Sequence, residues 1–277
     1  MTHRLTKHHG LGNDFLVLLG PADALAGVGA DEGRRWCDRH RGIGADGLLL
    51  GITDTEGADL VMTLYNADGS GAEMSGNGIR CLAQAEADRR GVARVELLIA
   101  TEGGPRTVSV EPGPDATSVV ASVDMGPAAP GPEPDGERGP IAEADDPVAL
   151  AAEPKQTRAL DLGNPHLVLL VDDPGAVDVH RAGRHWEAAY RAGINVHAVA
   201  PSPGEDDALT MAIWERGAGA TEACGTGATA AARAAHDWGL VGTDVVVHMR
   251  GGDVTVSVGE RMTLHGPAVR IATVEVG

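Results

Sequence analysis

The chain has 277 residues, 43% of them hydrophobic, which is enough for two globular domains or one large one. Its formal net charge of −18 argues against binding to nucleic acid, which needs a basic surface. The sequence contains no signal-peptide core, no apolar run of membrane-spanning length and no paired cysteine spacing, so we expect a cytoplasmic protein without membrane segments, disulfides or a metal site.

In the first half, apolar runs alternate with glycine-rich turns. Helices are expected at 31–39, where the chain is charged, and from Gly76 to about residue 90. Residues 126–140 are rich in Pro, Gly and acidic residues and predict a connector. The strands expected in this half lie at 15–19, 48–52, 60–65, 92–101, 105–111 and 117–124.

The second half continues in the same style. Helices are expected near 146–152 and at about 176–190 and 226–238, the last of them rich in alanine. The strands expected here lie at 167–171, 198–200, 209–214, 244–249, 253–259, 261–265 and 268–275.

The turns of the first half recur in the second at an offset of about 150 residues. Leu11-Gly12-Asn13 matches Leu162-Gly163-Asn164, and both precede apolar runs. The stretch 73–78 matches 222–227, which aligns Ser75 with Cys224. We therefore predict a mixed α/β (α+β) chain of two pseudo-symmetric domains, each presenting a glycine turn and a helix start.

Cys224 lies at a glycine-flanked turn directly before the alanine-rich helix. The amides of a helix start carry partial positive charge, so we expect them to lower the pKa of this thiol and to bind an anion. The alternative is a buried, inert cysteine before an ordinary helix. If the two halves face each other, Ser75 and Cys224 flank one site.

Such a site suits an amino acid held by its α-carboxylate between two helix starts. Neutralising the carboxylate stabilises the carbanion that forms when the α-proton leaves. A base on one face and an acid on the other then invert the α-carbon, without any need for pyridoxal phosphate.

With these motifs the sequence resembles the diaminopimelate epimerase family. The resemblance implies that each half is a β-barrel-like sheet around a central helix, that the chain acts without cofactor on LL- and meso-2,6-diaminopimelate, and that it forms homodimers. It also implies an N-terminal half at 1–125 joined by the last strand at about 268–277, a C-terminal half at 126–267, and an active site in the cleft between them. The motifs that carry it are Lys7 to Phe15, 42–47, 65–70, 76–80, 163–166, 193–196, 215–227, Gly251-Gly252 and 266–268.

The resemblance also implies roles for individual residues. Cys224 is similar to one of two catalytic thiols, and His166 and Glu215 to the acid–base residues that support them. The amides of Gly76, Asn77, Gly225 and Thr226 are expected to bind the reacting carboxylate. The remaining residues are expected to line the site or hold the far end of the substrate, with Glu215 also receiving an ammonium group: Asn13, Asn66, Asn164, Asn195 and Arg216.

Ser75 stands where the family has its other catalytic cysteine. A hydroxyl is a far weaker acid than a thiol and needs another group to activate it. Three hypotheses stay open: an engineered replacement, a natural variant whose hydroxyl relays a proton with help from His166 or Glu215, or one-sided chemistry on a related amino acid. The chain could accordingly be an epimerase of diaminopimelate, another racemase, epimerase or dehydratase of the same fold, or a silent amino-acid-binding protein. Cys81, six residues further on, is expected to face the core.

Overall fold

A computed structural model describes residues 2–72, 74–135 and 154–277. The chain divides into two compact units, one formed by Met1–Asp124 with His265–Gly277 and the other by Met125–Leu264. The helix expected near 146–152 lies outside the described residues, as does the second part of the expected connector.

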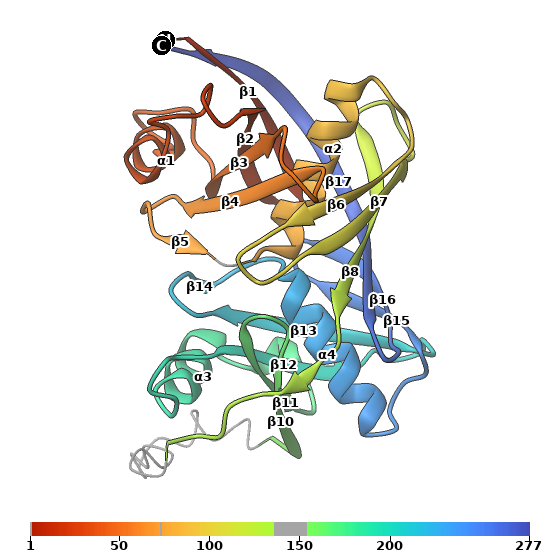
Figure 1. Ribbon diagram of the computed structural model, residues 1–277. Helices are drawn as coiled ribbons and strands as arrows, with labels where there is room; N and C mark the ends of the chain where they lie inside the picture. The colour runs from red at the N-terminus through yellow and green to blue at the C-terminus, as the bar shows by residue number, and fades with distance from the viewer. Residues whose placement is uncertain (1, 73, 136–153) are drawn as a thin grey trace. The chain divides into compact units, whose positions relative to one another are not determined.

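The first unit is a barrel of strands around one long helix (Figure 1). Its elements are β1 (His3–Gly10), β2 (Asn13–Pro21), α1 (Ala30–Cys37), β3 (Gly47–Thr53), β4 (Leu60–Asn66), β5 (Gly71–Ala72), α2 (Gly76–Arg90), β6 (Val95–Ala100), β7 (Arg106–Pro112), β8 (Ser118–Gly126) and the last strand, β17 (Met262–Val276).

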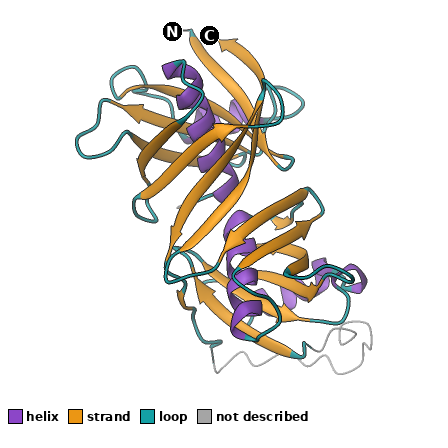
Figure 2. Cartoon of the chain, turned by 90° about the vertical axis from the view of Figure 1, so that its right-hand side faces the viewer, coloured by secondary structure: helices purple, strands orange, loops and turns teal. Residues whose placement is uncertain are grey.

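These strands pair in a closed ring. The order is β1, β2, β3, β4, β6, β7, β8, β17 and back to β1, with β2–β3 and β4–β6 parallel. Helix α2 runs through the interior of this ring (Figure 2), and its residues from Gly76 to Ala87 are buried. A closed ring leaves no unpaired strand edge, and the central helix supplies its core.

The second unit is built in the same way around α4. Its elements are β9 (Ala129–Pro130), β10 (Gln156–Asp161), β11 (Pro165–Leu170), a 3₁₀ turn at Pro174–Ala176, α3 (Val179–Glu187), β12 (Asn195–Pro201), β13 (Ala208–Glu215), β14 (Gly219–Ala220), α4 (Gly225–Asp237), β15 (Asp244–Met249) and β16 (Gly252–Ser257).

Strand pairing confirms the internal repeat. β2–β3 and β11–β12 are parallel, each joined by a helix, and the next pairs, β3–β4 and β12–β13, are antiparallel. The same match holds for β4–β6 with β13–β15 and for β6–β7 with β15–β16. The predicted mixed α/β class with two pseudo-symmetric halves is thus confirmed.

Both central helices are rich in alanine and glycine, which lets strands pack closely around them. Ala228, Ala230 and Ala231 of α4 are completely buried. Helix α2 ends at Gly91, whose φ of 67° is left-handed and whose amide bonds the carbonyls of Ala87 and Asp88. Glycine adopts this conformation without steric cost, so the helix stops there.

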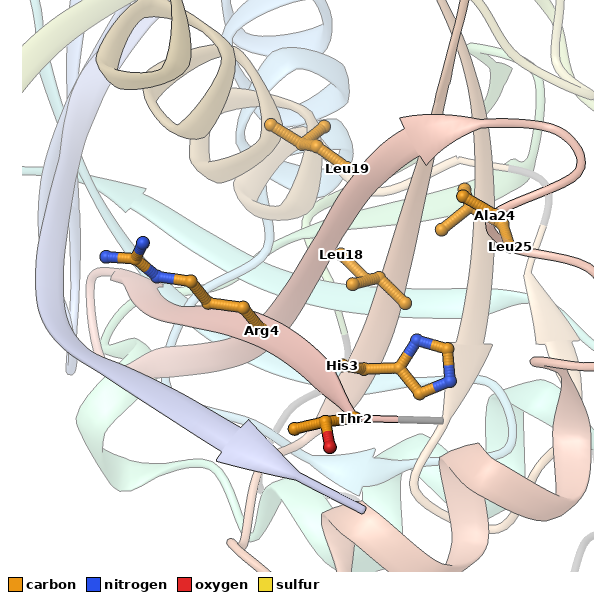
Figure 3. Close-up of a pocket in the computed structure, with 7 residues that line it drawn as sticks. All are labelled: Thr2, His3, Arg4, Leu18, Leu19, Ala24 and Leu25. Atoms are coloured by element: carbon orange, nitrogen blue, oxygen red, sulfur yellow. The ribbon is translucent and has the colours of Figure 1, made fainter.

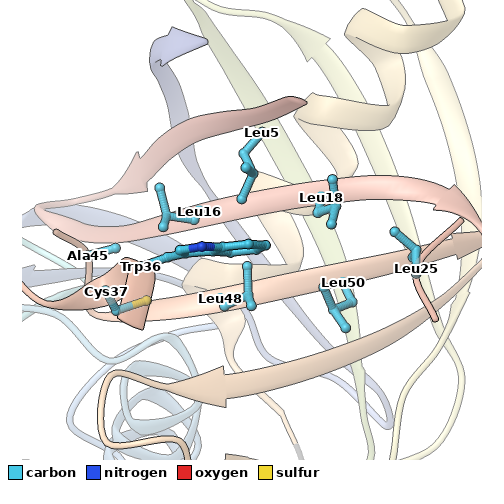
Figure 4. Packing of buried hydrophobic residues seen from close by; sticks show 9 residues of the cluster. All are labelled: Leu5, Leu16, Leu18, Leu25, Trp36, Cys37, Ala45, Leu48 and Leu50. Atoms are coloured by element: carbon cyan, nitrogen blue, oxygen red, sulfur yellow. The ribbon is translucent and has the colours of Figure 1, made fainter. Parts of the chain in front are cut away.

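The parallel pairs β2–β3 and β11–β12 are buried on both faces, which explains their unbroken apolar sequences. One face meets the central helix and the other meets the crossover helix. In the first unit Trp36 and Cys37 of α1 pack against Leu16 and Leu48 (Figure 4). In the second, Trp186 of α3 packs against the corresponding cluster.

The sequence-based boundaries differ from the structure in three places. The strands expected at 261–265 and 268–275 are one strand, β17, because Gly266-Pro267 does not interrupt it. Strand β1 is not among the expected strands, because its mixed side chains belong to a strand with one exposed face. Strand β10 was not expected at all, and it too is only partly buried.

Candidate active site

The two aligned residues, Ser75 and Cys224, occupy the same structural position. Each is the N-cap of its central helix, with φ/ψ of −139°/119° and −136°/109°. The Ser75 hydroxyl accepts a hydrogen bond from the amide of Gly78 at 3.0 Å, and the Cys224 sulfur accepts one from Gly227 at 3.4 Å. Each helix start thus directs its first amides toward an acid–base side chain.

The first turn of each helix is held by a side chain four residues along. Thr229 donates from its hydroxyl to the carbonyl of Gly225 at 2.9 Å. Arg80 donates to the carbonyls of Gly76 and Pro267 at 3.0 and 3.2 Å and to Oδ1 of Asn77 at 2.9 Å. Arg80 is fully buried, and burial lowers its pKa to about 10.

In the first unit, side chains link the helix start to the β1–β2 turn. Asn77 donates to Oδ1 of Asn13 at 3.2 Å, and Asn13 donates to Asp46 at 2.9 Å. The structure therefore brings Asn13, the first residue of β2, into contact with Asn77, which lies in the first turn of α2 two residues after Ser75. Asn66 is the last residue of β4 and donates to the hydroxyl of Ser70 at 3.0 Å.

An ion-pair network stabilises the turn between β1 and β2. Asp14 contacts Lys7 at 2.8 Å and Arg39 at 2.6 Å, and Arg39 also reaches Asp46 at 2.8 Å. Burial alone would raise the pKa of Asp14, but the hydrogen bonds from Arg39 and Lys7 lower it overall. The network fixes Asp46 and, through it, Asn13.

In the second unit, the thiol of Cys224 is almost completely buried, with 4% exposure. Burial raises its pKa well above the usual value, and the negative charge of nearby Glu215 adds to that effect, outweighing the hydrogen bonds from Thr226 and Gly227. This corrects the expectation of a lowered pKa: desolvation and a carboxylate outweigh the helix start. Cys224 is at rest a thiol, and therefore a proton donor.

Glu215 ends strand β13 and accepts a hydrogen bond from Thr221 at 2.6 Å. The strand places it close enough to Cys224 to influence the thiol electrostatically. Gly225 and Thr226 open helix α4, and Thr226 lies 3.5 Å from the sulfur of Cys224. The thiol, the carboxylate and the predicted anion-binding amides thus belong to one cluster.

His166 lies on β11 beside a second histidine, His197 of β12. Nδ1 of His166 and Nε2 of His197 are 2.9 Å apart, and Nε2 of His166 lies 2.8 Å from Oδ1 of Asn164. Burial is the main cause of the low pKa of both histidines: the pKa of His166 lies well below its usual value, and that of His197 is about 3. Both rings are therefore neutral near pH 7.

Asn195 positions the loop that carries Arg216. Its amide nitrogen donates to the carbonyl of Pro165 at 2.8 Å, and its oxygen accepts from the backbone amide of Arg216 at 3.0 Å. The guanidinium of Arg216 donates to the carbonyl of Ala192 at 3.1 Å, and the side chain is otherwise exposed.

Several participants were not singled out from the sequence: Arg80, Asp46, Thr221 and His197. His197 could have been found, because it stands two residues after Asn195 in a strand and therefore shares its face. Arg80 and Asp46 stand within motifs, but their partners are distant in sequence. Cys81 is buried as expected, and burial raises its pKa to about 12.

A surface depression of about 470 Å³ lies elsewhere in the first unit, lined by residues of β1, β2 and the segment after β2 (Figure 3). It contains none of the candidate residues. Within residues 2–72, 74–135 and 154–277, no three His, Cys, Asp or Glu side chains are grouped so that they could hold a metal ion. No helix among the same residues is long and apolar enough to cross a membrane.

Comparison with known proteins matches most of the chain. The family model described as diaminopimelate epimerase matches residues 5–129 and 158–271. A diaminopimelate epimerase from Nostoc punctiforme is 34% identical over 283 residues, covering 99% of both chains. One from Pelotomaculum thermopropionicum is 37% identical over 296 residues, covering 96% of both.

Solved structures match in fold at low sequence identity. A predicted epimerase from Pseudomonas aeruginosa superimposes with a TM-score of 0.75 at 15% identity, covering 99% of both chains. A hydroxyproline epimerase from Agrobacterium vitis, with bound trans-4-hydroxy-L-proline, gives 0.69 at 16% identity, covering 99% of this chain and 92% of the other.

Proposed function

The chain belongs to the diaminopimelate epimerase family, and from this premise we propose that it inverts one α-carbon of 2,6-diaminopimelate, interconverting the LL and meso forms. The observation that carries the proposal is the pair of matched helix starts, each capped by an acid–base side chain. The activity would serve lysine and peptidoglycan precursor synthesis.

We propose that the α-carboxylate of the substrate binds at the helix starts, at the amides of Gly76, Asn77, Gly225 and Thr226. The macrodipoles of α2 and α4 favour an anion there. Because they also offset charge on the carboxylate as the α-proton leaves, they stabilise the carbanion more than the bound substrate.

Cys224 is suited to deliver a proton to the carbanion, because its resting form is the thiol. Glu215 lies nearby and is suited to take a proton from solvent or from a substrate ammonium group and return it to the Cys224 thiolate that this step leaves. On the opposite face Ser75 would take the proton from the substrate, with Glu215 as the group that activates its hydroxyl, because both ring nitrogens of His166 are already hydrogen-bonded. The two faces together give inversion.

We propose that the far end of the substrate is held by Arg216 with Asn66, Asn164 and Asn195, and that Asn13 lines the site. Arg216 suits a carboxylate because its guanidinium can donate two parallel hydrogen bonds, and most of that side chain is exposed. Asn195 would act through the loop, since its carboxamide already holds the backbone amide of Arg216.

The reaction would proceed without pyridoxal phosphate. That cofactor forms a Schiff base with a lysine, and the sequence has only Lys7 and Lys155. Lys7 is held by Asp14 and the carbonyl of Gly44, and Lys155 pairs with Asp172. Neither belongs to the clusters around Ser75 and Cys224.

Ser75 favours two alternatives. One is a racemase, epimerase or dehydratase of the same fold that acts on another amino acid, and the other is a silent amino-acid-binding homologue. Its hydroxyl has the same backbone support as the thiol of Cys224, but a much higher intrinsic pKa. The alternatives differ in which α-hydrogen they exchange with solvent.

The test is proton NMR in deuterium oxide with LL-diaminopimelate, meso-diaminopimelate and a panel of other amino acids. We expect exchange at the α-carbon of diaminopimelate together with conversion of LL to meso. Exchange with another amino acid alone would favour a different racemase, and binding without any exchange would favour a silent homologue. Ser75→Cys should raise the exchange rate by about 10²-fold, a gain typical of a well-matched acid–base group. An unchanged rate would contradict the two-sided assignment.

We further propose that the chain works as a homodimer in the cytoplasm. Its three cysteines are free thiols, as a reducing compartment would keep them. Val92, Leu98, Val120 and Ile271 of the first unit are exposed large apolar residues that a partner could cover. Sedimentation analysis across a concentration series tests the dimer.

A further inference from the structure

The histidine pair His166–His197 contains a residue to which the proposed mechanism gives no role. Both rings are completely buried, on neighbouring parallel strands, and they stack with centroids 5.1 Å apart. Placing two polar rings in a core is costly unless they hydrogen-bond well. Their presence therefore needs a reason.

The hydrogen bonds fix where each proton lies. Oδ1 of Asn164 can only accept, so Nε2 of His166 carries the proton and Nδ1 of the same ring is the acceptor. Nε2 of His197 must then be the donor to that Nδ1. The remaining Nδ1 of His197 is a buried lone pair with no hydrogen-bond partner among the described residues. The direction of the whole chain of bonds is from His197 to His166 to Asn164.

This direction decides what Asn164 presents. Because its oxygen faces His166, its NH₂ group is turned the other way, as a donor. In the other tautomer of His166, Nε2 would be a lone pair. The amide of Asn164 would then turn around and present its oxygen, which repels a carboxylate.

The first unit shows that the fold does not require these histidines. Phe15 of β2 pairs with Gly47 of β3, and His166 of β11 pairs with Asn195 of β12. Phe15 and His166 therefore occupy equivalent positions in the two units. In the repeat, Tyr65 corresponds to Trp214. Because Tyr65 pairs with Leu48 and Trp214 pairs with Val196, the residues that follow, Leu49 and His197, also occupy equivalent positions. Both apolar counterparts, Phe15 and Leu49, are buried. The same place in the barrel can be filled by apolar side chains.

Contacts at the central helices support the alignment. A Cβ added at Gly78 would lie 3.4 Å from Cδ2 of Leu49. A Cβ added at Gly227 would lie 2.6 Å from Nε2 of His197 and 3.1 Å from the sulfur of Cys224. His197 therefore lies against the first turn of α4, beside the thiol, where the first unit has a leucine.

We propose that His197 is a positioning residue for the reaction: its Nε2–H holds His166 in the tautomer that turns the NH₂ of Asn164 outward, toward a carboxylate of the substrate. The inference rests on the proposed function for its kinetic consequence. The tautomer itself exists without substrate and can be measured independently.

The direct test is nitrogen-15 NMR of the histidine rings in the protein without substrate. In the wild type we expect His166 with Nε2 protonated and Nδ1 accepting. His197→Leu, which copies the residue of the first unit, should lose that pattern and give mixed tautomers. His197→Gln, whose side-chain NH₂ can replace the donor, should keep it.

Kinetics with diaminopimelate form the second test. His197→Leu should lower kcat/KM by about 10²-fold, the size of effect expected when a group is misplaced by about 1 Å. His197→Gln should recover most of this loss. His8→Leu is the matched control, because it removes another buried histidine, bonded to Gln84 at 2.8 Å in the first unit, outside the site. It should leave kcat/KM within about twofold of the wild type.

The outcomes separate the two proposals. Inactivity of the wild type toward diaminopimelate would overturn the proposed function and leave the NMR test standing. A His166 tautomer unchanged in His197→Leu would overturn the positioning role, whatever the activity. A Gln variant as impaired as the Leu variant would do the same, and if the Leu variant does not fold, the Gln variant and the wild-type spectrum still decide.

Discussion

The starts of α2 and α4 have nearly the same backbone but different surroundings. At α2 the N-cap is a hydroxyl, the first turn is held by the buried cation Arg80, and the neighbouring strands present Phe15 and Leu49. At α4 the N-cap is a thiol, the first turn is held by Thr229, and the strands present two hydrogen-bonded histidines. The repeat therefore preserves backbone geometry and varies the chemistry placed upon it.

Both units therefore have the same helix start, whereas the side chains around that start differ between the two halves. In the second half the titratable groups lie in a buried cluster, where the low dielectric strengthens the interactions between charges. The first half keeps its charges in the ion-pair network around Asp14 and Asp46, one step away from Ser75. Four experiments test this difference between the two helix starts.

The largest effect is expected from making the two N-caps alike. Cys224→Ser should lower the rate of α-hydrogen exchange by at least about 10³-fold, within the range for losing an acid–base group. Ser75→Ala, which also keeps the helix, should cost less, since the hydroxyl is the weaker partner. NMR exchange rates measure both. Equal losses would mean that the two N-cap positions are chemically equivalent and that Cys224 is not the stronger partner.

Removing the side chains that hold the first turns should affect stability unequally. Arg80→Met should lower the free energy of unfolding by about 3 kcal/mol, because the carbonyls of Gly76 and Pro267 and Oδ1 of Asn77 lose a donor. Thr229→Val should cost about 1 kcal/mol, because one hydrogen bond is lost. Urea unfolding gives both values. A costlier Thr229→Val would reverse the comparison.

The third experiment adds a methyl group to each helix start. Gly227→Ala should destabilise the protein by about 2 kcal/mol, because its Cβ would lie 2.5 Å from Cε1 of His197. Gly78→Ala should change stability by less than about 1 kcal/mol, because its nearest contact is 3.2 Å, to Cβ of Ser75, and alanine favours a helix. Thermal unfolding compares them, and equal shifts would show that the side chains of His197 and Leu49 yield equally.

The last comparison is the pH dependence of stability. Burial lowers the pKa of His8, His166 and His197, so below about pH 6.5 the unfolded chain binds protons at these residues and the folded chain does not. The free energy of unfolding should therefore fall as the pH decreases from 6.5 to 5, with a slope that approaches about 1.4 kcal/mol per unit for a histidine that stays neutral in the folded chain, as His197 does. His197→Gln should reduce the slope by one such step, and His8→Leu should change it in the same direction. An unchanged slope in either variant would mean that its histidine is already protonated in the folded state.

Much of the fold could be predicted from the sequence, because periodicity and glycine turns are local signals. The repeat indicated matched helices, and both helix starts lie within a residue of their predicted positions. Strand β10 and the continuity of β17 could not be predicted, since half-buried strands carry mixed patterns and a Gly-Pro pair usually ends a strand.

The site was predictable in composition but not in electrostatics. The motifs named Cys224, Glu215 and His166, yet the pKa of Cys224 has the opposite shift from the one expected. A helix start is visible in sequence, whereas the burial of the sulfur and the approach of Glu215 depend on tertiary packing. His197 was overlooked because its partners, His166 and Gly227, come from a different strand and a helix.

Strand β17 has a consequence for how the protein is made. It pairs with β1 from His3 opposite Val276 to His9 opposite Val269, so strands from near the two ends of the chain lie side by side. A ribosome makes the whole of Met125–Leu264 before it makes the part of β17 that pairs with β1. The first unit to emerge is thus the last to be completed, and until then β1 and β8 are open edges that another chain could pair with.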